Sequence, residues 1–518
     1  MEYDQILLPS DAYDQVLRSY VHPSTWINPT PTGKYNLVVL GGGTSGLVSA
    51  GGTGGLGGKV ALVEKALLGG DCLNTGCVPS KALIRAARAI FDTRSGASFG
   101  VQFKELPEFN FAQAMERMRR LRADIAPHDS AQRFMDEFNV DVFLGDGKFV
   151  SPTELEVAGQ RLQFERAVIA TGARAAVPPI EGLAQTGYYT NESIFKLIEL
   201  PRRLAIIGAG PIGCELAQCF QRFGAEVTVI DQGEVLPRED RDVAAIVQRQ
   251  LEREGVKFRL KARILRVEAE ERHKALHISQ AEYDHKVECD AILVATGRTP
   301  NTDGLGLDVA GVQYSLQGVI VNDHLRTSNP RIFAAGDVCS QFKFTHAADA
   351  MARNVIANAF FFGRRKVSAL TMPWCTFTDP EIAHVGYSEA QATAAGLAVA
   401  TITQPFDDVD RAILDSETEG LARVHYDKKT GQILGGTIVA RHAGEMIGQL
   451  TLAITAGLKI SALASAIQPY PVQADALKKI GDAYMRTKLT PGVKTLFAKW
   501  FAFRPKSSRQ RRAFRAKY

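Results

Sequence analysis

The 518-residue sequence lacks the features that mark a membrane-spanning or secreted protein. It has no apolar run long enough to cross a bilayer, and residues 1–20 mix acidic with apolar residues instead of placing a basic segment before an apolar one. Its seven cysteines are odd in number and irregularly spaced, which excludes a dense disulfide framework. We therefore expect a cytoplasmic protein in which a close pair of cysteines serves catalysis or metal binding.

Most of the chain also lacks an excess of positive charge, although the formal net charge is +5. Residues 492–518 contain nine Lys or Arg and no acidic residue, so the remainder of the chain carries a net charge of −4. A body of this kind has no strong electrostatic attraction for nucleic acid. The sequence therefore argues against a nucleic-acid partner.

Two glycine-rich segments repeat one pattern. In each, an apolar strand leads into a Gly-x-Gly-x-x-Gly turn and a helix-length segment, and a second strand ends at an acid 18 positions after the third glycine. The first copy has strands at 35–40 and 59–63, with Gly41, Gly43, Gly46 and Glu64; the second has strands at 204–207 and 226–230, with Gly208, Gly210, Gly213 and Asp231. Each copy closes with a strand that runs into Ala-Thr-Gly, at 170–172 and 295–297. The sequence therefore contains an internal duplication.

The repeated pattern is that of a dinucleotide site. The first glycine makes the turn, the second lets the backbone approach a pyrophosphate, the third allows close helix packing, and the acid bonds a ribose. Two bound dinucleotides are therefore expected. Asp231 would accept a hydrogen bond from a free 2′-hydroxyl and repel a 2′-phosphate, so NADH is favoured, although Arg238 leaves NADPH open.

The segment after the first turn is unusually rich in glycine, at positions 51, 52, 54, 55, 57 and 58. Each glycine costs up to about 1 kcal/mol of helix stability relative to alanine. We expect this helix to be stabilised by tertiary packing.

A close cysteine pair lies between the two copies. Residues 69–81 read Gly-Gly-Asp-Cys-Leu-Asn-Thr-Gly-Cys-Val-Pro-Ser-Lys and lead into a helical pattern over residues 82–90. A structural zinc site would need two further Cys or His ligands nearby, and the sequence offers none. Thiols at the start of a helix are stabilised as thiolates by the dipole and by unpaired N–H groups. Cys72 and Cys77 are therefore predicted to be reactive; the alternative is a loop with two buried thiols.

These motifs, together with Ala335-Gly336-Asp337 and the segment 377–381 (Phe-Thr-Asp-Pro-Glu), closely resemble the class I FAD-dependent pyridine nucleotide-disulfide oxidoreductases over residues 35–489. The resemblance implies an α/β fold with two Rossmann-like dinucleotide-binding domains, for FAD and NAD, plus an α+β dimerisation domain. We expect an N-terminal arm (1–34), an FAD-binding domain (35–184 and 297–368), an NAD(P)-binding domain (185–296), a dimerisation domain (369–490) and a basic amphipathic tail (491–518).

The resemblance also implies roles for individual residues. Cys77 would pack on the flavin, Cys72 would meet the substrate, and Lys81 would pair with Glu215 where hydride enters, in a homodimer whose active site is shared between subunits. The expected cofactor-binding residues are Gly41, Gly43, Gly46, Glu64, Gly70, Lys81, Thr171, Gly172, Gly336, Asp337, Thr345, Gly208, Gly210, Gly213, Asp231, Gly297 and Arg298. No resident metal site is expected.

One segment departs from the disulfide reductases of this family, which carry a C-terminal His and, five residues later, a Glu as an acid–base dyad. Here the positions are Tyr470 and Asp475, and a tyrosine with an ordinary pKa of about 10 is a poor base. Mercuric reductases resemble the chain in this tyrosine, but they usually bear a C-terminal cysteine pair, whereas the last cysteine here is Cys375. The expected function is NAD(P)H-dependent reduction of a soft metal ion or a disulfide.

Three alternatives stay open. They are a dihydrolipoamide dehydrogenase-like enzyme, a membrane-docked quinone-reducing dehydrogenase, and a redox sensor that binds lipid or RNA through its tail. Residues 493–503 combine apolar and aromatic side chains with lysines, which suits peripheral contact at the inner face of a membrane. A disordered basic end, or a helix packed on the partner subunit, is the competing interpretation of the tail.

Overall fold

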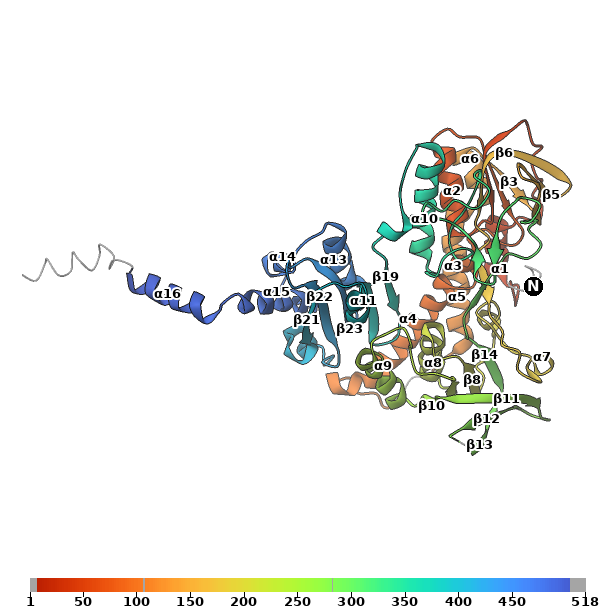
Figure 1. Ribbon diagram of the computed structural model, residues 1–518. Helices are drawn as coiled ribbons and strands as arrows, with labels where there is room; N and C mark the ends of the chain where they lie inside the picture. Colours follow the sequence, from red (N-terminus) through yellow and green to blue (C-terminus); the bar gives the residue numbers. More distant parts are fainter. Residues whose placement is uncertain (1–6, 106–107, 282, 504–518) are drawn as a thin grey trace, which may run out of the picture. The chain divides into compact units, whose positions relative to one another are not determined.

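The computed structural model describes residues 7–105, 108–281 and 283–503, in two compact units (Figure 1). The first unit contains the chain up to residue 370 together with 376–378, and the second contains 371–375 and the chain from 379 onwards. Among the described residues, no helix combines the length and the apolar character that a membrane crossing requires.

The first unit contains two parallel sheets with the same strand order. One has the order β3-β2-β1-β6, with bounds Val140–Leu144, Val60–Glu64, Tyr35–Leu40 and Gln160–Ile169, and β18 (Ile332–Ala334) also pairs with β6. The other has the order β10-β9-β8-β14, with bounds Lys257–Arg259, Glu226–Ile230, Arg203–Ile207 and Ala291–Val294. All of these pairings are parallel. The common order agrees with the duplication predicted from the sequence.

The two glycine-rich turns connect the central strands to helices α2 (Thr44–Gly55) and α8 (Pro211–Phe223). Gly41 has φ +111°, a conformation that L side chains rarely adopt. A Cβ at Gly46 would lie 1.7 Å from the carbonyl oxygen of Gly41, and one at Gly213 would lie 2.0 Å from that of Gly208. The first and third glycines are therefore required by backbone contact, as the pattern predicts.

The remaining glycines of α2 allow its neighbours to pack closely. A Cβ at Gly52 would lie 2.6 Å from Ile356 Cδ1 on α10 (Thr345–Phe360), and α2 and α10 run side by side in Figure 1. A Cβ at Gly54 would lie 2.2 Å from the carbonyl oxygen of Phe138, at the end of α6 (Ala131–Phe138). Close tertiary packing thus accounts for Gly52 and Gly54.

The N-terminal segment contains a helix that the sequence analysis did not predict, α1 (Ala12–Val21). It packs on α5 (Phe111–Ile125), and a buried ion pair of 2.6 Å joins Asp14 to Arg122. Removal of the Arg122 charge would leave the Asp14 carboxylate buried without a cation, which lowers the free energy of unfolding by about 3–5 kcal/mol. This contact anchors the segment to the first unit.

Antiparallel strands complete the first unit. β4 (Gly147–Ser151) and β5 (Glu154–Val157) pair in sequence with the beginning of β6. A separate three-stranded sheet is formed by β11 (Ala262–Ala269), β12 (Lys274–Gln280) and β13 (Tyr283–Cys289).

The second unit is built on a five-stranded sheet of order β19-β20-β23-β22-β21. Its bounds are Pro373–Thr376, Glu381–Gly386, Ile433–Ala440, Leu421–Asp427 and Val399–Pro405. Helix α13 (Ala443–Thr455) packs on β20 and β23, and α15 (Asp475–Thr487) packs on β21 and β22. Apolar side chains of these elements form one buried core. The chain continues into α16 (Pro491–Phe503).

Two neighbouring glycines test the packing of α2. Gly54→Ala should destabilise the protein by about 1–3 kcal/mol, because the new methyl group overlaps a backbone carbonyl. At exposed Gly55 the nearest atom is Phe138 Cδ1 at 3.7 Å, so Gly55→Ala should stabilise by up to about 1 kcal/mol. Urea denaturation measures both. Equal changes in the free energy of unfolding of the two variants would contradict the close contact between Gly54 and the Phe138 carbonyl oxygen.

Candidate active site

The two cysteines lie on consecutive short elements after β2. Cys72 belongs to α3 (Gly70–Asn74), and Cys77 is the first residue of α4 (Cys77–Ser95), so the helix begins five residues before the predicted pattern. The Asn74 side chain donates to the carbonyl oxygens of Leu68 and Gly70, at 3.0 and 2.8 Å. These bonds fix the turn that brings the thiols together.

The surroundings of Cys77 favour its thiolate. A hydrogen bond from the Cys72 thiol is the largest cause; the Thr345 hydroxyl, 3.3 Å from Cys77 Sγ, and the charge of Lys81 also outweigh burial and lower the pKa of Cys77 to about 6. The same hydrogen bond between the thiols is the largest cause that raises the pKa of Cys72, and burial is the second. The reduced pair therefore holds its negative charge on Cys77 and its proton on Cys72.

Lys81 and Glu215 form the ion pair that the resemblance implies. Lys81 Nζ lies 2.8 Å from Glu215 Oε2, and Glu215 is buried on α8. The other carboxylate oxygen accepts a 2.9 Å hydrogen bond from the backbone N–H of Phe377, and Lys81 lies over the ring of Phe377 at 4.5 Å. The pair joins α4, which carries Cys77, to the second glycine-turn helix.

The two acids of the duplicated pattern occupy equivalent positions. Glu64 accepts backbone N–H bonds from Gly42 and Ala66, each at 2.6 Å. Asp231 accepts them from Ala209, at 2.7 Å, and from Gly233, at 2.6 Å. Each acid therefore lies against its glycine-rich turn, where the ribose of a bound dinucleotide would be recognised.

The residues around the first turn fit a dinucleotide such as FAD. A Cβ at Gly43 would have only Gly70 Cα nearby, at 3.7 Å, so the backbone at the start of α2 is open to a phosphate. Gly70 itself must be glycine, because it has φ +56° and a Cβ there would lie 2.7 Å from Gly43 Cα. Within the described part of the chain, no side chain caps α2 or α8, which leaves their first N–H groups for anions.

Other predicted cofactor residues also lie in the first unit. Thr171 donates to the carbonyl oxygen of Asn301 at 2.7 Å. Gly172, Gly297 and Gly336 have φ of +67°, +130° and +82°. A Cβ at Gly336 would overlap the Ser45 hydroxyl at 2.5 Å, which places the Asp337 segment beside the start of α2. Their roles stay predictions.

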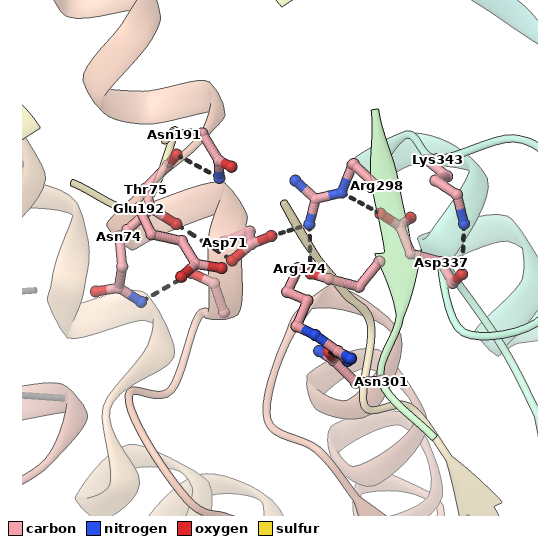
Figure 2. Close-up of polar contacts among 12 residues, drawn as sticks. Asp71, Asn74, Thr75, Arg174, Asn191, Glu192, Arg298, Asn301, Asp337 and Lys343 are labelled. Carbon is pink, nitrogen blue, oxygen red and sulfur yellow. Dashed lines mark hydrogen bonds and ion pairs between the residues drawn. The ribbon is translucent and has the colours of Figure 1, made fainter. Parts of the chain in front are cut away.

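Sequence reasoning missed a charge cluster around Arg298, which Figure 2 shows between Asp71 and Asp337. Arg298 pairs with Asp71 Oδ2, and its Nε lies 3.3 Å from Asp337 Oδ2. Lys343 donates to the carbonyl oxygen of Asp337 at 2.8 Å. The predicted cofactor residue Arg298 therefore contacts the segment that carries Cys72.

Tyr470 and Asp475 lie in the second unit. The hydroxyl of exposed Tyr470 donates to Asp410 Oδ2 at 2.8 Å. This bond, with the added charge of Asp475 at the start of α15, raises the pKa of Tyr470. Tyr470 therefore stays protonated at neutral pH more completely than a free tyrosine, so it is less available to accept a proton.

The charge on Cys77 can be measured by alkylation of the reduced enzyme. A lowered pKa leaves Cys77 as thiolate above its midpoint and as thiol below it, so its alkylation rate should rise with pH around a midpoint near 6. Cys339 is the internal control, because burial raises its pKa to about 12. Peptide mass spectrometry distinguishes the two sites. A Cys77 midpoint at the ordinary thiol value of about 8.5 would contradict this description.

Comparison with known proteins places the chain in a family. The model of the pyridine nucleotide-disulphide oxidoreductases matches residues 35–352, and that of their dimerisation domain matches residues 372–480. The chain is 35% identical over 446 residues to a mercuric reductase of Lysinibacillus sphaericus, covering 86% of this chain and 81% of that protein. It is 34% identical over 459 residues to a dihydrolipoyl dehydrogenase of Thermus scotoductus, covering 87% and 97%.

A solved structure supports the same assignment. The HOCl-induced flavoprotein disulfide reductase RclA from Escherichia coli, solved as a Cu(II) complex, is 29% identical with a TM-score of 0.77, covering 87% of this chain and 100% of that one. The predicted fold class is thereby confirmed. The chain belongs to the pyridine nucleotide-disulphide oxidoreductase family.

Proposed function

We propose that the protein is an NADH-dependent flavoprotein that passes electrons through FAD to a Cys72–Cys77 disulfide and then to a soft metal ion or a small disulfide. In this proposal residues 35–184 and 297–368 bind FAD, residues 185–296 bind NADH, and residues 369–490 form a homodimer that shares its active sites. The observation that carries the proposal is the Cys72–Cys77 pair, with its thiolate on the first residue of α4.

FAD, when bound, supplies a two-electron carrier between the nicotinamide and the cysteines. The chain's own residues would bind and orient the reactants around it. The glycine turns and the starts of α2 and α8 would bind the phosphates, and Asp231, which lies against the second turn, would select a free ribose hydroxyl. The Lys81–Glu215 pair fixes a positive charge two helical turns or less from Cys77. Cys72 retains the proton and meets the acceptor.

The choice of acceptor rests on what the chain shares with its relatives and on where it differs. Several relatives are named mercuric reductases, and one is named a dihydrolipoyl dehydrogenase. Oxidation of a dithiol needs a base, and Tyr470 is a poor one, so a dithiol substrate is disfavoured. A soft metal ion binds thiolate directly and needs no such base.

The variant Cys72→Ser tests the route of the electrons. NADH should still bleach the flavin absorbance of this variant, because nicotinamide oxidation precedes any step at sulfur. NADH-driven reduction of Hg²⁺ or of a small disulfide should fall by at least about 100-fold, because the variant lacks a nucleophilic group. The matched control is Cys339→Ser, at a thiol outside the pair. Unchanged turnover of Cys72→Ser would remove the disulfide from the mechanism. Faster bleaching by NADPH than by NADH would contradict the role of Asp231.

We also propose that α16 docks the enzyme on anionic membrane. Val493, Leu496, Phe497, Trp500 and Phe501 have the spacing of one helix face, and Leu496, Trp500 and Phe501 are each more than three-fifths exposed. Lys494 and Lys499 border this face, as lysines do at a lipid surface. The other seven basic residues, at 504–518, lie outside the described residues; each basic residue near anionic lipid adds about 1 kcal/mol.

Vesicle sedimentation tests the docking. The full chain should co-sediment with vesicles that contain phosphatidylserine but not with pure phosphatidylcholine, and salt should weaken binding. Truncation after Pro491 should abolish binding and leave NADH oxidation intact, and Phe497→Ser with Phe501→Ser should weaken it at unchanged charge. Equal binding by the truncated form, or no binding by the full chain, would overturn the proposal; the second result would favour a helix packed on the partner subunit.

A further inference from the structure

The cluster around Arg298 connects two segments that the proposed function uses separately (Figure 2). Arg298 begins β15 (Arg298–Pro300), and its side chain is only 15% exposed. One side chain therefore pairs with Asp71, beside Cys72, and with Asp337 after β18. Its Nη2 also donates to the carbonyl oxygen of Ala173 at 2.6 Å, which fixes the guanidinium in place.

Asp71 links Arg298 to the turn that carries both cysteines. Its Oδ2 pairs with Arg298, while its Oδ1 accepts a 3.2 Å hydrogen bond from the Thr75 hydroxyl. The Asp71 carbonyl oxygen accepts the Thr75 N–H at 2.9 Å. Thr75 lies between Cys72 and Cys77, so the carboxylate is bonded to the guanidinium on one side and to the cysteine turn on the other.

The cluster also has an uneven charge. Burial acts to lower the pKa of Arg298, but Asp71, Asp337 and Glu192 outweigh it and raise the pKa overall, so the guanidinium stays charged. Burial raises the pKa of Asp337 and of Glu192, and the Arg298 charge opposes both shifts. Two cations, Arg298 and Lys343, therefore face three carboxylates, and of these carboxylates Asp71 is the one bonded to the cysteine turn.

We propose that the Asp71–Arg298 ion pair sets the reduction potential of the Cys72–Cys77 pair, with both residues acting as positioning residues. The inference rests on the proposed function. In the reaction, NADH and the disulfide give NAD⁺, one thiol and one thiolate: the S–S bond breaks, two electrons arrive, and the hydride's hydrogen becomes the thiol proton. Because reduction creates a negative charge on sulfur, the balance between Arg298 and its carboxylates decides how readily reduction occurs.

The test measures the potential in the FAD-loaded enzyme. Wild type, Asp71→Asn and Arg298→Gln are equilibrated with mixtures of oxidised and reduced dithiothreitol, and thiols are trapped by alkylation and counted by mass spectrometry. Asp71→Asn leaves Arg298 less compensated, so its equilibrium should shift toward the dithiol by about tenfold, or ~30 mV for a two-electron couple. Arg298→Gln leaves the carboxylates uncompensated, so its equilibrium should shift about as far toward the disulfide.

The control is Asp303→Asn, which breaks the exposed Arg174–Asp303 pair of 2.8 Å and should leave the potential unchanged. Opposite shifts in the two variants support the inference, since loosening of the turn alone would move both in one direction. Shifts of the same sign, or none, overturn it. If Arg298→Gln does not retain FAD, the sign of the Asp71→Asn shift decides. A wild-type pair that forms no disulfide overturns the proposed function itself, a result separable from an unshifted potential.

Discussion

The stabilisation of negative charge on Cys77 is the interaction on which the rest of the site depends. The residue begins α4, where the helix dipole favours an anion, and the Cys72 thiol, the Thr345 hydroxyl and Lys81 add to that effect. The same hydrogen bond that lowers the pKa of Cys77 raises that of Cys72. Two chemically identical thiols are thereby made different: one holds charge and the other holds the proton.

The duplicated fold provides the framework for this asymmetry. Each copy places an acid against its own glycine-rich turn, and Lys81–Glu215 joins the helix of the cysteine pair to the helix after the second turn. Because Glu215 is buried and also bonded to the Phe377 backbone, removal of Lys81 would leave a buried carboxylate without its cation. The ion pair therefore joins the two dinucleotide-binding folds within the first unit.

Local sequence patterns predicted much of this arrangement. The strand bounds at 35–40 and 226–230, the turn glycines and the position of the cysteine pair near a helix start all depend on short-range geometry, which spacing records. The packing role of Gly52 and Gly54 was predicted only in outline, because the partners Ile356 and Phe138 are distant in sequence. The replacement of the family's histidine base by Tyr470 was visible in the sequence, but the hydrogen bond from Tyr470 to Asp410 was not.

The Arg298 cluster shows why the remainder could not be predicted. Asp71 and Arg298 are separated by 227 positions, and nothing in the local pattern of either indicates the other. The same holds for Asp14 and Arg122, which bury an ion pair across a segment that looks irregular in sequence. Such contacts form only when elements distant in sequence pack together in the folded chain.

An anaerobic titration with NADH tests the central claim most directly, because it counts the electrons that the protein accepts. If the Cys72–Cys77 disulfide takes electrons in addition to FAD, each chain should consume about two equivalents of NADH, and a long-wavelength thiolate charge-transfer band should develop with the first. Consumption of about one equivalent, with no such band, would show that the cysteine pair accepts no electrons and would contradict the account.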